Sequence, residues 1–272
     1  MYVTLAQHPE PPAGDDRAFM TPNAVIVLDG ASAFAARDVP ASTYAQHLGS
    51  TMAALVDGTD EALTVLLAEA IKTTAADLGL TPGGRAPSST LAVVRRREDA
   101  SVDVLVLGDS QVVIPGKILR DDRLGPLATE QRTAYRERLA SGHGYDDEHR
   151  QLLAALQAEQ LRRRNKPGGY WIAEADPAAA EQALTRHLSP HEVPWCVLAT
   201  DGAYKPMEYL GLDDWPTVAT ATSDDLAGLL QRCQEWEATD ERGQRLPRAK
   251  RHDDKTLAVC SPSGDVQRTS VG

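Results

Sequence analysis

Several aspartates in this sequence stand where an apolar run ends or begins. The set consists of Asp29 in VIVLDG, Asp109 in VLVLGDS, Asp201 in CVLATDG, Asp253 in HDDKTLAVC, and the pair Asp15–Asp16 ahead of the first run. Taken singly, an Asp–Gly dipeptide is most often a plain turn. Taken together, carboxylates held at strand ends offer the oxygen ligands that Mg²⁺ or Mn²⁺ prefers, and their mutual repulsion is costly unless a cation binds. The pattern therefore indicates a candidate site for a divalent cation.

Strands and helices must position these side chains, and the hydrophobic pattern predicts where they lie. Strands are expected over residues 2–6, 24–28, 90–95, 102–107 and 111–114, in PWCVLATDG, GGYWIAEA and KTLAVC, and near 265–270. Helices are expected over 41–56, in TDEALTVLLAEAIKTTAADLG, and over 128–139, 146–164, 177–187, 203–210 and 224–237. The turn GDS would join two of the strands into an antiparallel meander. Strand clusters alternate with helix pairs without a regular βαβ series, which favours an α+β layered domain.

Composition excludes several classes of function. The chain has 272 residues, of which 42% are hydrophobic, and this suits one large domain or two small ones. A formal net charge of −11 argues against a general nucleic-acid binder and against binding to an anionic membrane surface. No apolar run reaches the length of about 18 residues that a membrane span needs, and the N-terminus lacks the pattern of a signal peptide. We therefore expect a cytoplasmic protein.

The cysteines support the same compartment. Cys196, Cys233 and Cys260 are odd in number and widely spaced. Cys196 and Cys260 lie in apolar runs that are typical of strands, so we expect them to be buried thiols. The absence of a disulfide framework fits a reducing cytoplasm.

The ordered set of motifs resembles the metal-dependent protein phosphatase family (PPM), the type 2C serine/threonine phosphatases. That family shows an acidic pair, a strand ending in Asp–Gly, a Thr-rich strand start, Gly–Asp–Ser, a strand ending in Ser/Thr–Asp–Gly, and Asp–Asn–x–Thr. This chain has GDDRAF, VIVLDG, PSSTLAVV, LVLGDSQVVI, VLATDGAY and DDKTLAVC in the same order. The resemblance implies a single type 2C phosphatase-like domain over residues 1–272. It implies a four-layer α-β-β-α sandwich, in which two antiparallel sheets are flanked by helices.

The resemblance also implies a centre of two Mg²⁺ or Mn²⁺ ions between the sheets, a third ion being a further option. Asp29 would bridge two ions, and the carbonyl of Gly30 would bind the second. Asp201 and Asp253 would complete the ligands of the first ion. The glycine of Asp–Gly permits the sharp turn that aims its carbonyl at the ion.

The remaining ligands follow from the other motifs. Asp15 and Asp16 would serve the second ion directly or through water, and Asp109 would match the ligand of a third ion, with Asp201 shared. A water between two divalent cations is a hydroxide nucleophile near neutral pH, so no serine or cysteine nucleophile is required. The resemblance therefore assigns catalysis to Asp16, Asp29, Asp201 and Asp253.

This sequence departs from the family pattern at several positions. Ala31 stands where many members have a histidine, the proposed general acid, and no arginine precedes the acidic pair to hold the substrate phosphate. Arg17 follows the pair at the wrong spacing. The pair is Asp15–Asp16 where the family usually has Glu–Asp, and Asp254 stands where it has Asn. These changes leave the expected metal ligands in place and concern substrate affinity.

Two basic features near the last motif have more than one interpretation. His252 adjoins Asp253 and is a minor candidate for a general acid. The stretch RLPRAKRHDD is either a solvated loop, which we favour, or a surface that attracts phosphorylated substrates.

The motifs favour a monomeric phosphatase that acts on phosphoserine or phosphothreonine in a phosphorylated protein partner. Two alternatives remain open. The same centre could act on a small-molecule phosphoester, which the missing arginine keeps in consideration. A non-catalytic module that binds phosphoproteins is disfavoured because Asp29, Asp201 and Asp253 are all retained.

Overall fold

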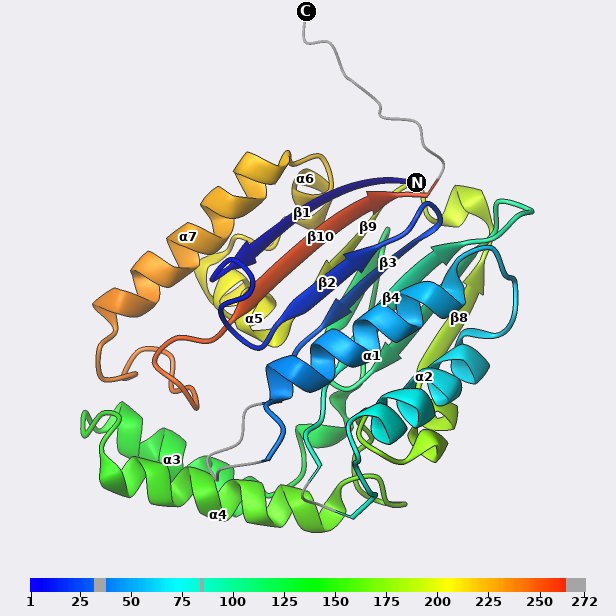
Figure 1. The fold of residues 1–272 in the computed structure, drawn as a ribbon. Coiled ribbons are helices and arrows are strands. Elements are labelled where there is room, and N and C mark those ends of the chain that lie inside the picture. Colours follow the sequence, from blue (N-terminus) through cyan, green and yellow to red (C-terminus); the bar gives the residue numbers. More distant parts are fainter. Residues whose placement is uncertain (32–37, 84–85, 263–272) are drawn as a thin grey trace, which may run out of the picture.

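Two antiparallel sheets pack against each other between layers of helices. The computed structural model describes residues 1–31, 38–83 and 86–262 (Figure 1). One sheet has the order β1 (Tyr2–His8), β10 (Lys255–Ser261), β9 (Cys196–Ala199), β6 (Gln111–Ile114) and β7 (Lys117–Arg120). The other has the order β2 (Arg17–Met20), β3 (Ala24–Leu28), β4 (Leu91–Arg96), β5 (Val102–Leu107) and β8 (Leu184–Leu188). The predicted α+β sandwich is confirmed.

Strand β3 shows why this region of the sequence is apolar throughout. Ile26 and Leu28 pack into the core beneath the helices, whereas Val25 and Val27 pack into the core between the sheets. Successive side chains of a strand point to opposite faces, so a strand that is covered on both faces needs apolar residues at every position. All five residues of β3 are buried as a result.

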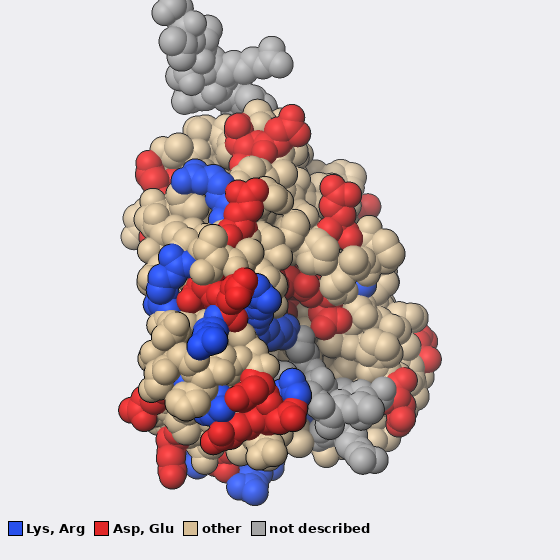
Figure 2. Space-filling view, turned by 90° about the vertical axis from the view of Figure 1, so that its left-hand side faces the viewer, with Lys and Arg blue, Asp and Glu red and all other residues tan. Residues whose placement is uncertain are grey.

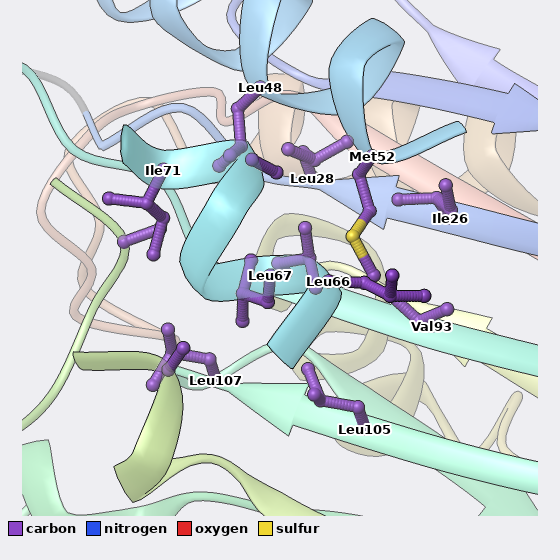
Figure 3. Close-up of a cluster of buried hydrophobic side chains, with 14 of the residues drawn as sticks. Ile26, Leu28, Leu48, Met52, Leu66, Leu67, Ile71, Val93, Leu105 and Leu107 are labelled. Atoms are coloured by element: carbon purple, nitrogen blue, oxygen red, sulfur yellow. The ribbon is translucent and has the colours of Figure 1, made fainter. Parts of the chain in front are cut away.

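A helix pair covers the sheet that contains β3. It consists of α1 (Ala41–Val56) and α2 (Leu63–Asp77). Figure 3 shows Leu48 and Met52 of α1 pointing toward Leu28 and Ile26 of β3. This packing fixes the strand end that precedes Asp29.

The opposite sheet is covered by α5 (Asp201–Leu210), α6 (Trp215–Val218) and α7 (Ser223–Thr239). Their buried side chains, among them Met207 and Leu230, pack on Val197 of β9 and Leu257 of β10. Helix α7 begins with a capping box in which Thr222 and Asp225 exchange hydrogen bonds.

Helices α3 (Thr129–Ala140) and α4 (Asp147–Arg163) stand apart from these layers, at the bottom of the view in Figure 1. They share a small core that includes Tyr135, Leu139 and Leu153. Asp146 caps α4 by accepting a hydrogen bond from the backbone of His149. The helices expected over 128–139 and 146–164 are therefore present nearly as predicted.

The meander predicted around GDS is wrong in its second half. β4 and β5 do pair, but β6 pairs with β7 and β9 in the opposite sheet. The turn at Gly108, whose φ is +85°, carries the chain from one sheet to the other. Asp109 consequently lies at the junction of the two sheets.

The helix predicted over 177–187 is also wrong. Residues Pro177–Gln182 form the 3₁₀ helix η2, and Leu184–Leu188 form strand β8, which pairs with the edge of β5. The other short helices are η1 (Asp122–Leu124) and η3 (Pro190–Glu192). Pairing with a distant strand overrides local helix propensity here.

Other expectations have mixed outcomes. In GGYWIAEA, where a strand is expected, only isolated bridges occur, such as that between Ser89 and Ala173. The strand expected near 265–270 lies outside the described residues. No helix within the described ranges is long and apolar enough to cross a membrane.

The prediction of two separate thiols at Cys196 and Cys260 is wrong. The two residues lie opposite each other in the register of β9 and β10, with Cα atoms 5.4 Å apart, and form a disulfide. Register between strands that are 64 residues apart is not visible in the sequence. The cysteine pattern therefore no longer supports a reducing compartment.

Gly49 of α1 offers a test of the packing over β3. A Cβ at this position would lie 2.0 Å from the ring of Phe19 and 2.8 Å from Leu28. A Cβ on Gly228 of α7 would meet no atom within 4 Å, so this glycine is a matched helical control. Urea unfolding should show Gly49→Ala to be less stable than Gly228→Ala by about 1–3 kcal/mol, because the gain in helix propensity is common to both variants. Equal changes in the two variants would contradict tight packing at Gly49.

Candidate metal centre

The predicted ligands come together at one end of the two sheets. β3 ends just before Asp29, β9 ends just before Asp201, and β10 begins just after Asp253. Because β9 and β10 are antiparallel, the end of one strand lies beside the start of the other. Figure 2, which views the molecule from the left of Figure 1, shows acidic and basic surfaces next to one another around a hollow.

Asp16 is the most deeply buried of these carboxylates. Its Oδ2 accepts hydrogen bonds from the hydroxyls of Thr200 (2.9 Å) and Thr256 (2.8 Å), while its buried Oδ1 has no hydrogen-bond partner. The pKa of Asp16 is raised to about 8, mainly by burial and in part by the charges of Asp253 and Asp254, which together outweigh the lowering effect of the two hydroxyls. The unpartnered oxygen is a free ligand position.

Asp29 is held through its backbone. Its carbonyl accepts hydrogen bonds from the Thr90 amide and the Ser89 hydroxyl, each at 2.9 Å. Burial raises the pKa of the Asp29 carboxyl well above its usual range, and the charges of Asp16, Asp201 and Asp253 raise it further. These four carboxylates therefore act on one another electrostatically.

The loop of the acidic pair packs on the Asp–Gly turn. A Cβ on Gly30 would lie 2.8 Å from the carbonyl oxygen of Asp15, so only glycine fits at this close approach. The Asp15 amide donates a hydrogen bond to Asp254 Oδ2 at 2.5 Å. Asp254, one of the departures from the family pattern, thus fixes the position of Asp15.

Asp201 opens helix α5, and Lys205 lies one helical turn further on. Lys205 Nζ is 2.5 Å from Asp201 Oδ2 and 3.8 Å from Asp109 Oδ2. Burial opposes ionisation of Asp201, but the charge and hydrogen bond of Lys205 outweigh it and lower the pKa of this carboxyl. For Asp109, burial and the charge of Asp201 prevail and raise the pKa.

Asp253 has a second lysine as its partner. Lys250 Nζ donates a hydrogen bond to Asp253 Oδ1 at 2.6 Å. Burial nevertheless raises the pKa of Asp253, since the charge of Asp201 offsets part of the effect of Lys250. Lys250 also acts electrostatically on Asp29 and Asp201. Burial lowers the pKa of Lys250, but Asp253, together with Asp29 and Asp201, outweighs burial and raises it.

Lys205 and Lys250 belong to the site but were not among the residues predicted for it. The sequence contains a weak signal for Lys205. Lys205 follows Asp201 by four positions on a helix, and Lys250 precedes Asp253 by three. A spacing of four brings helical side chains such as Lys205 and Asp201 together, but such pairs are common on surfaces and give no sign of a site by themselves. Lys250 and Asp253 lie in a loop, where a spacing of three carries no such signal.

The minor candidates lie elsewhere or have structural contacts. His252 Nδ1 lies 3.2 Å from Glu237 Oε2, next to the buried pair of Glu237 and Lys255. Arg17 donates hydrogen bonds to the carbonyls of Pro12, Gly14 and Asp16, and so braces the loop of the acidic pair.

The stretch RLPRAKRHDD is more ordered than a solvated loop. Arg248 donates a hydrogen bond to the buried Asp240 carboxylate at 2.7 Å and another to the carbonyl of Arg251. Its guanidinium also lies over the Trp236 ring, 5.7 Å from the centroid. This arginine organises the loop that carries Lys250 and Asp253.

The carboxylate oxygens are of the type that binds a hard divalent cation, but the side chains are not yet arranged around a common metal position. No three His, Cys, Asp or Glu side chains in the described parts of the chain already stand in metal-binding geometry. The carboxylates are nevertheless the ligand type for Mg²⁺ or Mn²⁺, and Asp16 Oδ1 is buried without a partner. A cation bound to Asp201 and Asp253 would share these carboxylates with their lysine partners or replace the lysines.

Comparisons with known proteins identify the fold. No family model matches the sequence, and no curated protein matches it either. A bacterial serine phosphatase superposes with a TM-score of 0.55 at 12% identity, covering 97% of this chain and 99% of that one. The Mycobacterium tuberculosis serine/threonine phosphatase PstP/Ppp gives a TM-score of 0.52 at 14% identity, covering 96% and 97%. The PPM Ser-Thr phosphatase MsPP from Mycobacterium smegmatis gives 0.51 at 16% identity, covering 95% and 97%.

Asp16 predicts a pH dependence of stability in the presence of chelator. Its pKa of about 8 in the folded protein exceeds the ordinary value of 3.8, so its contribution to stability is complete below about pH 4 and is lost as the pH rises through 8. Asp16→Asn removes this loss while keeping an oxygen for Thr200 and Thr256. In EDTA at about pH 9, the variant should be more stable than the wild type by about 2 kcal/mol or more in urea unfolding.

The exposed Asp77 at the end of α2 supplies the control, because Asp77→Asn should leave the pH profile unchanged. An Asp16→Asn protein that is less stable than the wild type at about pH 9 would contradict the raised pKa.

Proposed function

We propose that this chain is a Mg²⁺- or Mn²⁺-dependent phosphatase that hydrolyses phosphoserine or phosphothreonine in proteins, as one phosphatase-like domain over residues 1–272. The convergence of Asp16, Asp29, Asp201 and Asp253 at one end of a fold shared with PPM-type serine/threonine phosphatases carries the proposal. When bound, the ions would supply a water of lowered pKa and positive charge for the phosphoryl oxygens.

The protein's own groups would hold that centre in several ways. Thr200 and Thr256 direct Asp16 so that Oδ1 remains free for a ligand. Tyr204 donates a hydrogen bond from its hydroxyl to the carbonyl of Asp109 at 3.1 Å and so fixes the turn between the sheets. Contacts of this kind orient metal ligands and affect metal affinity strongly.

Asp15, Gly30 and Asp109 are proposed as the outer members of the site. The hydrogen bond from Asp15 to Asp254 and the close approach of Gly30 place the acidic loop against the turn. Asp109 is joined to Asp201 through the shared Lys205. In this proposal they would bind the second and third ions directly or through water.

A second candidate is a module that binds phosphoproteins without hydrolysing them. The ion pairs that Lys205 makes with Asp201, and Lys250 with Asp253, favour it because each carboxylate already has a cationic partner. The two candidates differ in whether phosphate is released.

Asp201→Asn tests the phosphatase proposal. With para-nitrophenyl phosphate and Mn²⁺ or Mg²⁺, the wild type should release phosphate, EDTA should abolish the activity, and the variant should lose it by at least about tenfold. The surface variant Asp77→Asn should retain full activity. If neither ion supports hydrolysis by the wild type, the phosphatase proposal is wrong.

Substrate class requires a second comparison. Turnover of phosphoserine and phosphothreonine peptides above that of a panel of small phosphoesters supports the protein phosphatase. The reverse order would favour a small-molecule phosphoester as the substrate.

A further inference from the structure

We propose that Lys205 and Lys250 are resident counter-ions of the aspartate centre, which compete with divalent cations for the carboxylates of Asp201 and Asp253. The inference rests on the proposed function in one respect, that these two carboxylates are metal ligands.

The geometry of Lys205 is the first argument. Lys205 lies between the carboxylates of two separate segments. Its Nζ is 2.5 Å from Asp201, which opens α5, and 3.8 Å from Asp109, which lies in the turn between β5 and β6. A charge that is shared between two otherwise repelling carboxylates relieves part of their repulsion. The lysine thereby does at this point what a divalent cation would do, with half the charge.

Lys250 has the corresponding place on the other side of the centre. It lies 2.6 Å from Asp253 Oδ1, on the loop that Arg248 orders from Asp240. Each of the two carboxylates that would complete the ligands of one ion, Asp201 and Asp253, therefore has a lysine of the same chain beside it. A cation tethered to the chain has a high effective concentration at its partner and needs no recruitment from solution.

These pairs differ from ordinary surface pairs of the same spacing. The side chains of Lys72 and Glu69 on α2 are 67% and 51% exposed. Lys205 is 52% exposed, but its partners Asp201 and Asp109 are only 20% and 24% exposed, and Lys250 and Asp253 are 31% and 34% exposed. Exposed pairs contribute little because water and salt screen them, but a partly buried pair beside further carboxylates is screened less. Removing either lysine therefore leaves less well compensated negative charge.

Two consequences follow from this competition. An incoming divalent cation must either displace the lysine ammonium groups or bind beside their like charge, so each lysine weakens metal binding. Without metal, the same lysines stabilise the fold by offsetting the repulsion among Asp29, Asp109, Asp201 and Asp253. The two effects have opposite signs for one and the same substitution.

The test compares Lys205→Met and Lys250→Met with Lys72→Met in the full chain. The control removes a lysine from an exposed pair of residues three positions apart, the same spacing as in Lys250 and Asp253. Calorimetric titration should show that each site variant binds Mn²⁺ about three- to tenfold more tightly than the wild type, and thermal unfolding in EDTA should show a lower Tm. Lys72→Met should change neither quantity, and Lys205→Arg, which keeps the charge, should remain near the wild type.

The outcomes separate this inference from the proposed function. The counter-ion role is overturned if neither site variant binds Mn²⁺ more tightly than the wild type does. It is also overturned if none of the proteins binds Mn²⁺. Hydrolysis by the wild type would still support the phosphatase in the first of these cases. Tighter binding in the site variants without hydrolysis by any protein supports the counter-ions and contradicts the phosphatase.

Discussion

Partly buried carboxylates repel one another at the end of the two sheets, and the fold has to hold them together. Burial and the charges of neighbouring carboxylates raise the pKa values of Asp16, Asp29 and Asp253. The pKa of Asp201 is lowered instead, chiefly by Lys205. Such an arrangement is unfavourable by itself, so the surrounding fold must enforce it. The packed cores on both faces of each sheet supply the stability that makes it tolerable.

The enforcement is achieved mostly through the backbone and neutral hydroxyls. The register of β9 and β10 brings Thr200 beside Thr256, and both hydroxyls then hold Asp16. The carbonyl of Asp29 is held by Ser89 and Thr90 at the start of β4. These contacts orient the carboxylates without neutralising them, which preserves their capacity to bind a cation.

The positions that depart from the phosphatase pattern take part in the same balance. Asp254 adds a carboxylate, and its oxygen accepts the Asp15 amide. Lys205 and Lys250 add positive charge at two carboxylates that would bind metal. The charges of this centre are therefore balanced in part by the chain's own lysines, and measured metal affinity is the informative quantity for this chain.

The strands that end at the aspartates and the order of the motifs can be read from the sequence, because an apolar run followed by Asp–Gly is a local pattern. The helices α3 and α4 were also predicted, the second of them with acidic residues at its start and arginines at its end. Three further features became visible only in the folded chain: GDS crosses between the sheets, residues 184–188 pair with β5, and Cys196 meets Cys260. The folded chain alone revealed Lys205 and Lys250 at the centre, because strand pairing and loop placement bring together residues whose separation along the chain carries no local signal.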